Sequence, residues 1–340
     1  MKKVLVHIGF SGMGDIICAT PVIRKLYNVY ERKISVASRM PMIFDNSPFV
    51  EESIFIDNCN VPSINHHTTD EFLSKYEDDY IIHRIGVGET NGESDGEFFR
   101  HIRHMTLTNY MASQLGFHLW GKDHELNFFP EKVDIRNKLN IPRDYICLNI
   151  SRNSKDREWD IKNFQMLVNL LNEDSIYVVL VGKSIDKEFH KFTNPHLYRD
   201  GDHGIELDDI NINITNGINL FDQTTLYEVW DIINNSKCFI TMDSGLLHLA
   251  GTTDTHIIQI GSTVNPIFRA PVRNNSQAYK YSFIGGECRE FCASNLKYSV
   301  RNFGNVKSML VDGVCYEYYD TYKCHPNINQ VYDKCMEVCN

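Results

Sequence analysis

Two short polar turns, far apart in the chain, carry residues whose types and spacing could do chemistry. Asp15 closes the turn Gly9-Phe10-Ser11-Gly12-Met13-Gly14-Asp15, and the second turn is Asp243-Ser244-Gly245, with His248 three residues on. A carboxylate beside glycine backbone can serve as a general base. Small polar residues and free backbone N–H groups can bind a phosphate. The alternative is that Asp15, Asp243 and Ser244 are ordinary helix caps and that His248 is a satisfied turn histidine.

Each turn follows a short apolar segment and precedes residues at helical spacing. This pattern predicts strands over residues 3–8 and 238–242, with a helix starting after each turn. Residues 256–260 predict another strand, which ends in Gly261-Ser262-Thr263. Because open α/β sheets bind ligands outside the carboxyl ends of their strands, we expect these polar residues at one binding edge.

A third turn carries positive charge. Residues 145–150 predict a strand, and Ser151-Arg152-Asn153-Ser154-Lys155-Asp156-Arg157-Glu158-Trp159 follows it. Its three cations could clamp a diphosphate, Lys155 as a point charge and Arg157 by its fork of N–H donors. A further strand over residues 176–181 ends at Gly182. Residues 84–104 predict a long surface loop, whose basic residues face either an acceptor or solvent.

The sequence as a whole predicts two globular domains. Strands alternate with helices in both halves, which predicts an α/β protein with two Rossmann-like parallel-sheet domains facing a cleft. We expect residues 1–141 to form the domain that binds the acceptor and residues 142–275 to form the domain that binds the nucleotide-sugar donor. With 340 residues, 42% apolar and 23% charged, the composition is that of a globular protein. A formal charge of −10 argues against a nucleic-acid binder, and the lack of a long apolar stretch predicts a cytoplasmic protein without a membrane span.

Cysteines crowd the C-terminal end of the chain. Six of the ten lie there: Cys288, Cys292, Cys315, Cys324, Cys335 and Cys339. In a chain without an export signal, such crowding favours metal over disulfides. We expect a cysteine-rich finger at residues 276–326 whose first four cysteines hold a structural zinc or iron, with reduced thiols or disulfides as the alternative. The last two are expected as free thiols on a C-terminal helix within residues 327–340.

Several of these segments together resemble glycosyltransferase family 9, the ADP-heptose heptosyltransferases of the GT-B fold. The matching residues are Gly14-Asp15 with Ala19-Thr20-Pro21-Val22-Ile23-Arg24-Lys25-Leu26, then Arg157-Glu158-Trp159, then Asp243-Ser244-Gly245-Leu246-Leu247-His248-Leu249-Ala250 with Gly261-Ser262-Thr263. The likeness runs from residue 1 to about residue 270. Heptosyltransferases that modify bacterial autotransporters are also similar in having an iron-bound cysteine finger, although with a different cysteine spacing.

The resemblance implies a metal-independent, inverting sugar transfer. It implies that Asp15 is the catalytic base and that Arg157, where the family has lysine, contacts the donor diphosphate. It also implies that the donor site contains Asp243, Ser244, Gly245 and His248. Together with the turns described above, the expected donor-binding set is Gly12, Gly14, Lys155, Gly182, Asp243, Ser244, Gly245, His248 and Thr263.

We therefore expect a glycosyltransferase that uses an NDP-sugar, with an ADP-sugar favoured, and needs no cofactor for catalysis. Its acceptor would be a hydroxyl of a glycan, a lipopolysaccharide or a protein. Two other readings stay open, because fold does not fix function. One is a nucleotide-sugar epimerase or hydrolase, which would consume the donor without an acceptor. The other is a non-catalytic binding module, whose cysteine finger would build an oligomer.

Overall fold

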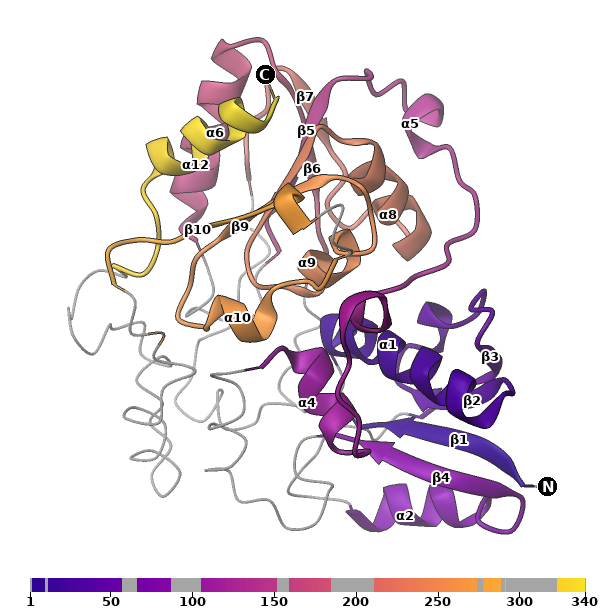
Figure 1. The fold of residues 1–340 in the computed structure, drawn as a ribbon. Helices are drawn as coiled ribbons and strands as arrows, with labels where there is room; N and C mark the ends of the chain where they lie inside the picture. The colour runs from indigo at the N-terminus through magenta and orange to yellow at the C-terminus, as the bar shows by residue number, and fades with distance from the viewer. Residues whose placement is uncertain are drawn as a thin grey trace.

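The computed structural model describes residues 2–9, 12–56, 66–86, 105–151, 159–184, 211–273, 278–288, 291 and 323–339. The described residues form two parallel sheets, one in each half of the chain (Figure 1). This arrangement confirms the predicted α/β architecture of two parallel-sheet domains.

The first sheet has four strands in the order β3-β2-β1-β4 among the described residues. The strands are β1 (Lys3–Ile8), β2 (Ile34–Ser38), β3 (Val50–Phe55) and β4 (Tyr80–Ile85). The elements around it are α1 (Met13–Tyr30), α2 (His66–Ser74), α4 (Leu107–Ser113), η1 (Pro41–Ile43) and η2 (Gly121–His124). The strand β1 lies inside the sheet, between β2 and β4, and is buried from Val4 onward.

The second sheet has six strands in the described part of the chain, in the order β10-β9-β8-β5-β6-β7. They are β5 (Tyr145–Asn149), β6 (Tyr177–Val181), β7 (Gly217–Asn219), β8 (Cys238–Thr241), β9 (His256–Ile260) and β10 (Tyr281–Ile284). Its shorter helices are α5 (Ile135–Lys138), α9 (Gly245–Ala250), α10 (Pro266–Arg269) and η6 (Ala278–Lys280). The longer helices are α6 (Ile161–Glu173), α8 (Leu226–Asn235) and α12 (Ile328–Cys339).

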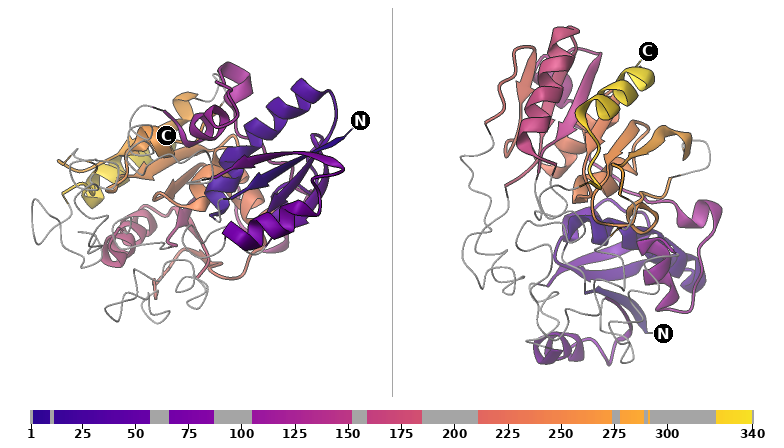
Figure 2. Two further views of the ribbon diagram at one scale, coloured as in Figure 1. Left: turned by 90° about the horizontal axis from the view of Figure 1, so that it is seen from below. Right: turned by 90° about the vertical axis from the view of Figure 1, so that its left-hand side faces the viewer.

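Helices cover both faces of the second sheet. Alternate strand residues separate the two faces: Leu148 and Ile240 pack with α6 and α12, whereas Cys147 and Phe239 pack toward α8 and α9. Figures 1 and 2 show α12 lying beside α6, although residues 174–327 separate the two helices in sequence. The hydrophobic core on the α8 and α9 side continues into the first domain through α1.

Two strands fall where the sequence indicated other structure. Arg84 was expected to begin a long loop, but it lies in β4, which is paired with β1 along its whole length. The polar side chains of this edge strand find partners, since Arg84 pairs with Asp70 at 2.6 Å and His83 contacts the Tyr30 hydroxyl at 2.9 Å. The strand β10 lies in the stretch expected to form the cysteine finger, yet it extends the second sheet beside β9.

One short helix, α5, lies where the chain passes from the first domain to the second. Only Ile135–Lys138 is helical. Asp134 caps its first turn by accepting a hydrogen bond from the Asn137 backbone N–H, and Asn140, just beyond the helix, has a positive φ of 53°. Residues 125–134, which precede the helix, form neither helix nor strand and link the two domains.

Candidate active site

The first helices after β1 and β8 pack against each other near their N-terminal ends. Gly14 in α1 and Gly245 in α9 are packed so closely that a Cβ on Gly14 would lie 3.2 Å from the Gly245 Cα and 2.5 Å from His248 Cδ2. Only glycine fits such an approach of two backbones. Both glycines were expected to touch the donor; in the structure they also join the two domains at this edge.

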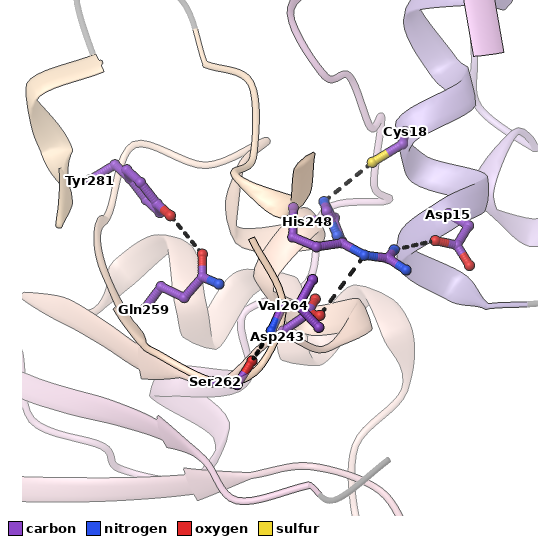
Figure 3. Close-up of polar contacts among 9 residues, drawn as sticks. Asp15, Cys18, Asp243, His248, Gln259, Ser262, Val264 and Tyr281 are labelled. Atoms are coloured by element: carbon purple, nitrogen blue, oxygen red, sulfur yellow. Dashed lines mark hydrogen bonds and ion pairs between the residues drawn. The ribbon is translucent and has the colours of Figure 1, made fainter. Parts of the chain in front are cut away.

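An arginine bridges the two aspartates singled out from the sequence. Arg269 Nη1 lies 2.6 Å from Asp15 Oδ1, and Arg269 Nε lies 3.8 Å from Asp243 Oδ2 (Figure 3). The side chain of Asp15 is 22% exposed and that of Arg269 17%, whereas Asp243 is 2% exposed. The carboxylate at the start of α1 and the carboxylate after β8 therefore share one cation.

Arg269 was absent from the residues expected at this site. It ends α10, a single helical turn that begins at Asn265-Pro266, where the Asn265 side chain accepts a hydrogen bond from the Ile267 backbone N–H. Burial by itself would lower the pKa of Arg269, but the carboxylates of Asp15 and Asp243 outweigh it and raise the pKa above its ordinary value. Arg269 is therefore a fixed positive charge. The Asn-Pro pair was the sequence signal that a helix starts here.

His248 is buried and points toward α1. Its Nδ1 lies 3.2 Å from Cys18 Sγ (Figure 3). Burial, and then the nearby Asp15 carboxylate, raise the pKa of the Cys18 thiol well above its ordinary value. The thiol consequently keeps its proton, which makes Cys18 unsuited to act as a nucleophile.

Asn149 fixes the turn after β8. This buried residue ends β5, which lies next to β8, and its Nδ2 donates to Thr241 Oγ1 at 2.9 Å and to Ser244 Oγ at 2.8 Å. The sheet order reverses direction between these two strands, as at the ligand-binding switch points of other open α/β sheets. Asn149 was not among the residues predicted for this site, because an asparagine at a strand end has no distinctive pattern.

The other residues expected to bind the donor lie at the carboxyl ends of neighbouring strands. Thr263 is buried after β9, and the adjacent Ser262 Oγ accepts a hydrogen bond from the Val264 backbone N–H (Figure 3). Gly182 follows β6 with a φ of 145°, a conformation that favours glycine. Gly12 comes directly before α1. Lys155 and Arg157 lie outside the described residues.

Tyr281 extends the buried polar layer onto β10. Its hydroxyl donates to Gln259 Oε1 at 2.6 Å, as Figure 3 shows. Burial, and then the charge of Asp243, raise the pKa of Tyr281 above its ordinary value. The phenol therefore stays neutral beside the aspartate.

Two of the four cysteines expected to hold a metal lie in segments that pair through their backbones. The backbone N–H of Cys288 donates to the Lys323 carbonyl at 2.9 Å, and that of Gly286 donates to the Cys324 carbonyl at 2.8 Å. The segment that carries Cys288 therefore runs beside the segment that carries Cys324. Cys292 and Cys315 lie outside the described residues.

The segment after Cys324 packs onto the second domain. The buried indole of Trp159 donates through Nε1 to the Pro326 carbonyl at 3.0 Å, and Tyr332 in α12 bonds to Asp174 after α6. In the described part of the chain, no helix combines the length and the apolar character that a bilayer crossing requires.

Comparison with known proteins identifies the family. The model of glycosyltransferase family 9 (heptosyltransferase) matches residues 108–298. A comparison with curated proteins gave no match.

Three solved structures resemble the chain along nearly all of its length. A family 9 glycosyltransferase from Veillonella parvula has a TM-score of 0.63 at 13% identity, covering 100% of this chain and 98% of that one. The Escherichia coli ADP-heptose lipopolysaccharide heptosyltransferase II has a TM-score of 0.59 at 16% identity, and the match covers 100% of this chain and 98% of that one. The iron-containing dodecameric glycosyltransferase TibC from enterotoxigenic Escherichia coli has a TM-score of 0.63 at 14% identity, and the match covers 99% of this chain and 79% of that one.

At such low identity these likenesses show the fold, which is GT-B. The family model covers more than half of the 340 residues. The chain therefore belongs to glycosyltransferase family 9, the heptosyltransferase family, and is a glycosyltransferase that uses a nucleotide-sugar donor.

Proposed function

We propose that the protein is an inverting transferase that moves a heptose, or a related sugar, from an ADP-linked donor to a hydroxyl group of a glycan or protein acceptor. The observation that carries the proposal is the contact of Asp15 with Arg269, which joins a candidate base to a fixed cation. Two named relatives of the same fold support the donor class. One is the ADP-heptose heptosyltransferase II of Escherichia coli, and the other is TibC, whose structure includes a complex with ADP-D-beta-D-heptose.

In this reaction Asp15 accepts the proton of the acceptor hydroxyl. Arg269 holds Oδ1, so Oδ2 is the oxygen that takes the proton. Oδ2 lies over Gly12, where an added Cβ would be 2.7 Å away, so the glycine keeps that side of the carboxylate open. The acceptor oxygen forms a bond to the anomeric carbon as the bond from that carbon to the diphosphate oxygen breaks on the opposite face. One positioned base contributes about 10²–10⁴-fold to such a step.

The departing nucleoside diphosphate carries the negative charge that must be stabilised. Arg269 is the described cation at this edge, and Arg157 and Lys155 are the cations proposed from the third turn. Fixed positive charge aimed at a leaving group lowers the barrier because it needs no reorganisation during the reaction. Asp243, Ser244, Gly245, His248, Thr263, Gly182 and Gly14 complete the proposed donor site.

The division of labour between the domains is part of the same proposal. Residues 1–141 would hold the acceptor and residues 142–275 the donor. A structural zinc or iron would join Cys288, Cys292, Cys315 and Cys324, and the backbone pairing of the segments that carry Cys288 and Cys324 supports that set. Such a metal would brace the finger, including any oligomer contact it makes, and would take no part in the transfer.

A donor screen tests the function. Purified protein is mixed with ADP-heptose, other ADP-sugars and UDP-sugars, and release of the nucleoside diphosphate is followed with and without glycan and protein acceptors. We expect release from ADP-heptose that depends on an acceptor. Release without acceptor would instead indicate an epimerase or hydrolase, and tight binding with no release would indicate a binding module.

A further inference from the structure

Three cysteine thiols meet on the second domain, away from the residues discussed above. The sulfur atoms of Cys238, Cys335 and Cys339 all lie within 4.8 Å of one another. Cys238 Sγ and Cys335 Sγ are 3.7 Å apart, and all three residues are free cysteines. None of these three belongs to the set Cys288, Cys292, Cys315 and Cys324.

The fold brings these thiols together from two distant segments. Cys238 is the first residue of β8, so it lies at the opposite end of that strand from Asp243. Cys335 and Cys339 are one turn apart on α12, which packs over β8 and β9. Residues four apart share one face of a helix, so both thiols reach the same point.

The spacing of the sulfur atoms suits a metal better than a disulfide. A disulfide would use two of the three thiols, would bring their sulfurs to about 2.05 Å and would leave the third unused. Tetrahedral thiolate ligands at a zinc–sulfur distance of about 2.3 Å place their sulfurs about 3.8 Å apart. The Cys238–Cys335 separation of 3.7 Å is close to that value.

A histidine stands on the same face of the sheet as the three thiols. His256 opens β9 and is the register partner of Cys238, and residues paired in this way on parallel strands point to the same side. Its Nε2 contacts Ser282 Oγ at 2.9 Å, a contact that orients the ring. An imidazole ligand oriented by a hydrogen bond from its other nitrogen is the usual arrangement in zinc sites.

We propose that Cys238, Cys335 and Cys339 bind a thiophilic divalent cation, zinc, with His256 or water as the fourth ligand. The ion would fasten the C-terminal helix α12 to the start of β8 and displace the thiol protons on binding. Its role is structural, since it lies at the edge of the sheet opposite Asp15 and Arg269. It is a second metal site, independent of the cysteine finger.

The test uses the full-length protein, with zinc measured per chain by elemental analysis. The variant is Cys335→Ser with Cys339→Ser, and its matched control is Cys288→Ser with Cys324→Ser. We expect the first pair to lose about one zinc per chain while the control keeps that ion. Cobalt(II) titration of the control, which lacks two finger cysteines, should still show thiolate-to-cobalt charge-transfer absorption. Adding Cys335→Ser and Cys339→Ser to that control should remove this absorption.

Two results would overturn the proposal. One is an equal metal content in the wild type and the Cys335→Ser/Cys339→Ser protein. The other is a Cys238–Cys335 disulfide, found by mass spectrometry of unreduced, alkylated peptides. If the double variant fails to fold, Cys339→Ser alone removes only the most exposed of the three ligands. Its zinc should then be lost to a competing chelator at a concentration at least about tenfold lower than for the wild type.

Discussion

Asp15 and Arg269 are 254 residues apart in the chain, yet Arg269 Nη1 lies 2.6 Å from Asp15 Oδ1. The first belongs to the helix that follows β1, and the second ends a one-turn helix of the other domain. Because each side chain is about four-fifths buried, solvent screens the pair only weakly. The contact therefore fixes the proposed base relative to the proposed donor domain.

Replacing the proposed base tests the chemistry directly. In Asp15→Asn the side chain keeps its size but can no longer accept the hydroxyl proton. We expect turnover to fall by about 10²–10⁴-fold while the Kd for the donor changes little. Nucleoside diphosphate release gives the rate and calorimetry the Kd. The matched control is Glu173→Gln, an exposed carboxylate on α6, and equal turnover in both variants would remove Asp15 from the mechanism.

Arg269 can be probed by a pair of substitutions. In Arg269→Ala, Asp15 and Asp243 lose the cation between them, and the proposed diphosphate site loses a positive charge. We expect kcat to fall by about tenfold or more and the donor to bind more weakly. Arg269→Lys keeps the charge but not the two-sided contact, so it should recover donor affinity more than kcat. A lysine variant as active as the wild type would contradict the positioning role.

Asn149 should matter for stability and donor binding together. Asn149→Ala removes the amide that donates to the buried hydroxyls of Thr241 and Ser244. Such a loss costs about 1–3 kcal/mol in the free energy of unfolding. Urea denaturation measures this value, and a parallel titration with ADP should show weaker binding. Asn163→Ala, at a partly exposed position on α6, is the control, and an equal effect of both would refute the special role of Asn149.

The contact of Gly14 with Gly245 predicts a steric effect. In Gly14→Ala the new methyl group would clash with the His248 ring and approach the α9 backbone. We expect the free energy of unfolding to fall by about 1–3 kcal/mol. Asn28→Ala, on the exposed face of the same helix, should leave stability unchanged or raise it slightly. Thermal melting of both variants decides the matter, and a stable Gly14→Ala protein would show that the helices can separate.

His124 gives a pH dependence whose sign follows from its surroundings. Burial, and then the neighbouring His118, lower the pKa of His124 from 6.5 to about 4. The unfolded chain therefore binds a proton that the folded chain does not, so stability falls as the pH drops from about 6.5 to 4. Because the side chain is partly exposed, we expect His124 to lower the free energy of unfolding by about 1–2 kcal/mol over this pH range.

Substitution of the same histidine isolates its contribution. His124→Gln can still hydrogen-bond to the Thr106 hydroxyl, which His124 Nε2 contacts at 2.7 Å, but it does not titrate. Urea denaturation at pH 7 and pH 4.5 should show a smaller acid loss in this variant than in the wild type. Equal losses in the two proteins would assign the pH dependence to other groups.

The sequence determined which segments form the sheets and where their polar turns lie. Strands β1, β5, β6, β8 and β9 are short, mainly apolar runs that lead into turns of glycine or polar residues, so local pattern was enough to find them. The edge strand β4 was missed because its polar residues Arg84 and His83 bond to α2 and α1, and those contacts come only with folding. Pattern likewise identified Asp15 and Asp243, since each lies after the end of a strand, within or just before the first turn of the helix that follows it.

Only the tertiary structure decided which of these residues meet. Arg269 and Asn149 have no motif of their own, and they gain their roles from strands and helices that pack beside them. The cysteines divide in the same way: their number was plain from the sequence, but the meeting of Cys238 with Cys335 depends on α12 folding back over β8. Contacts between residues so far apart in sequence produce no sequence pattern, because hydrophobic periodicity reports only the local secondary structure of neighbouring residues.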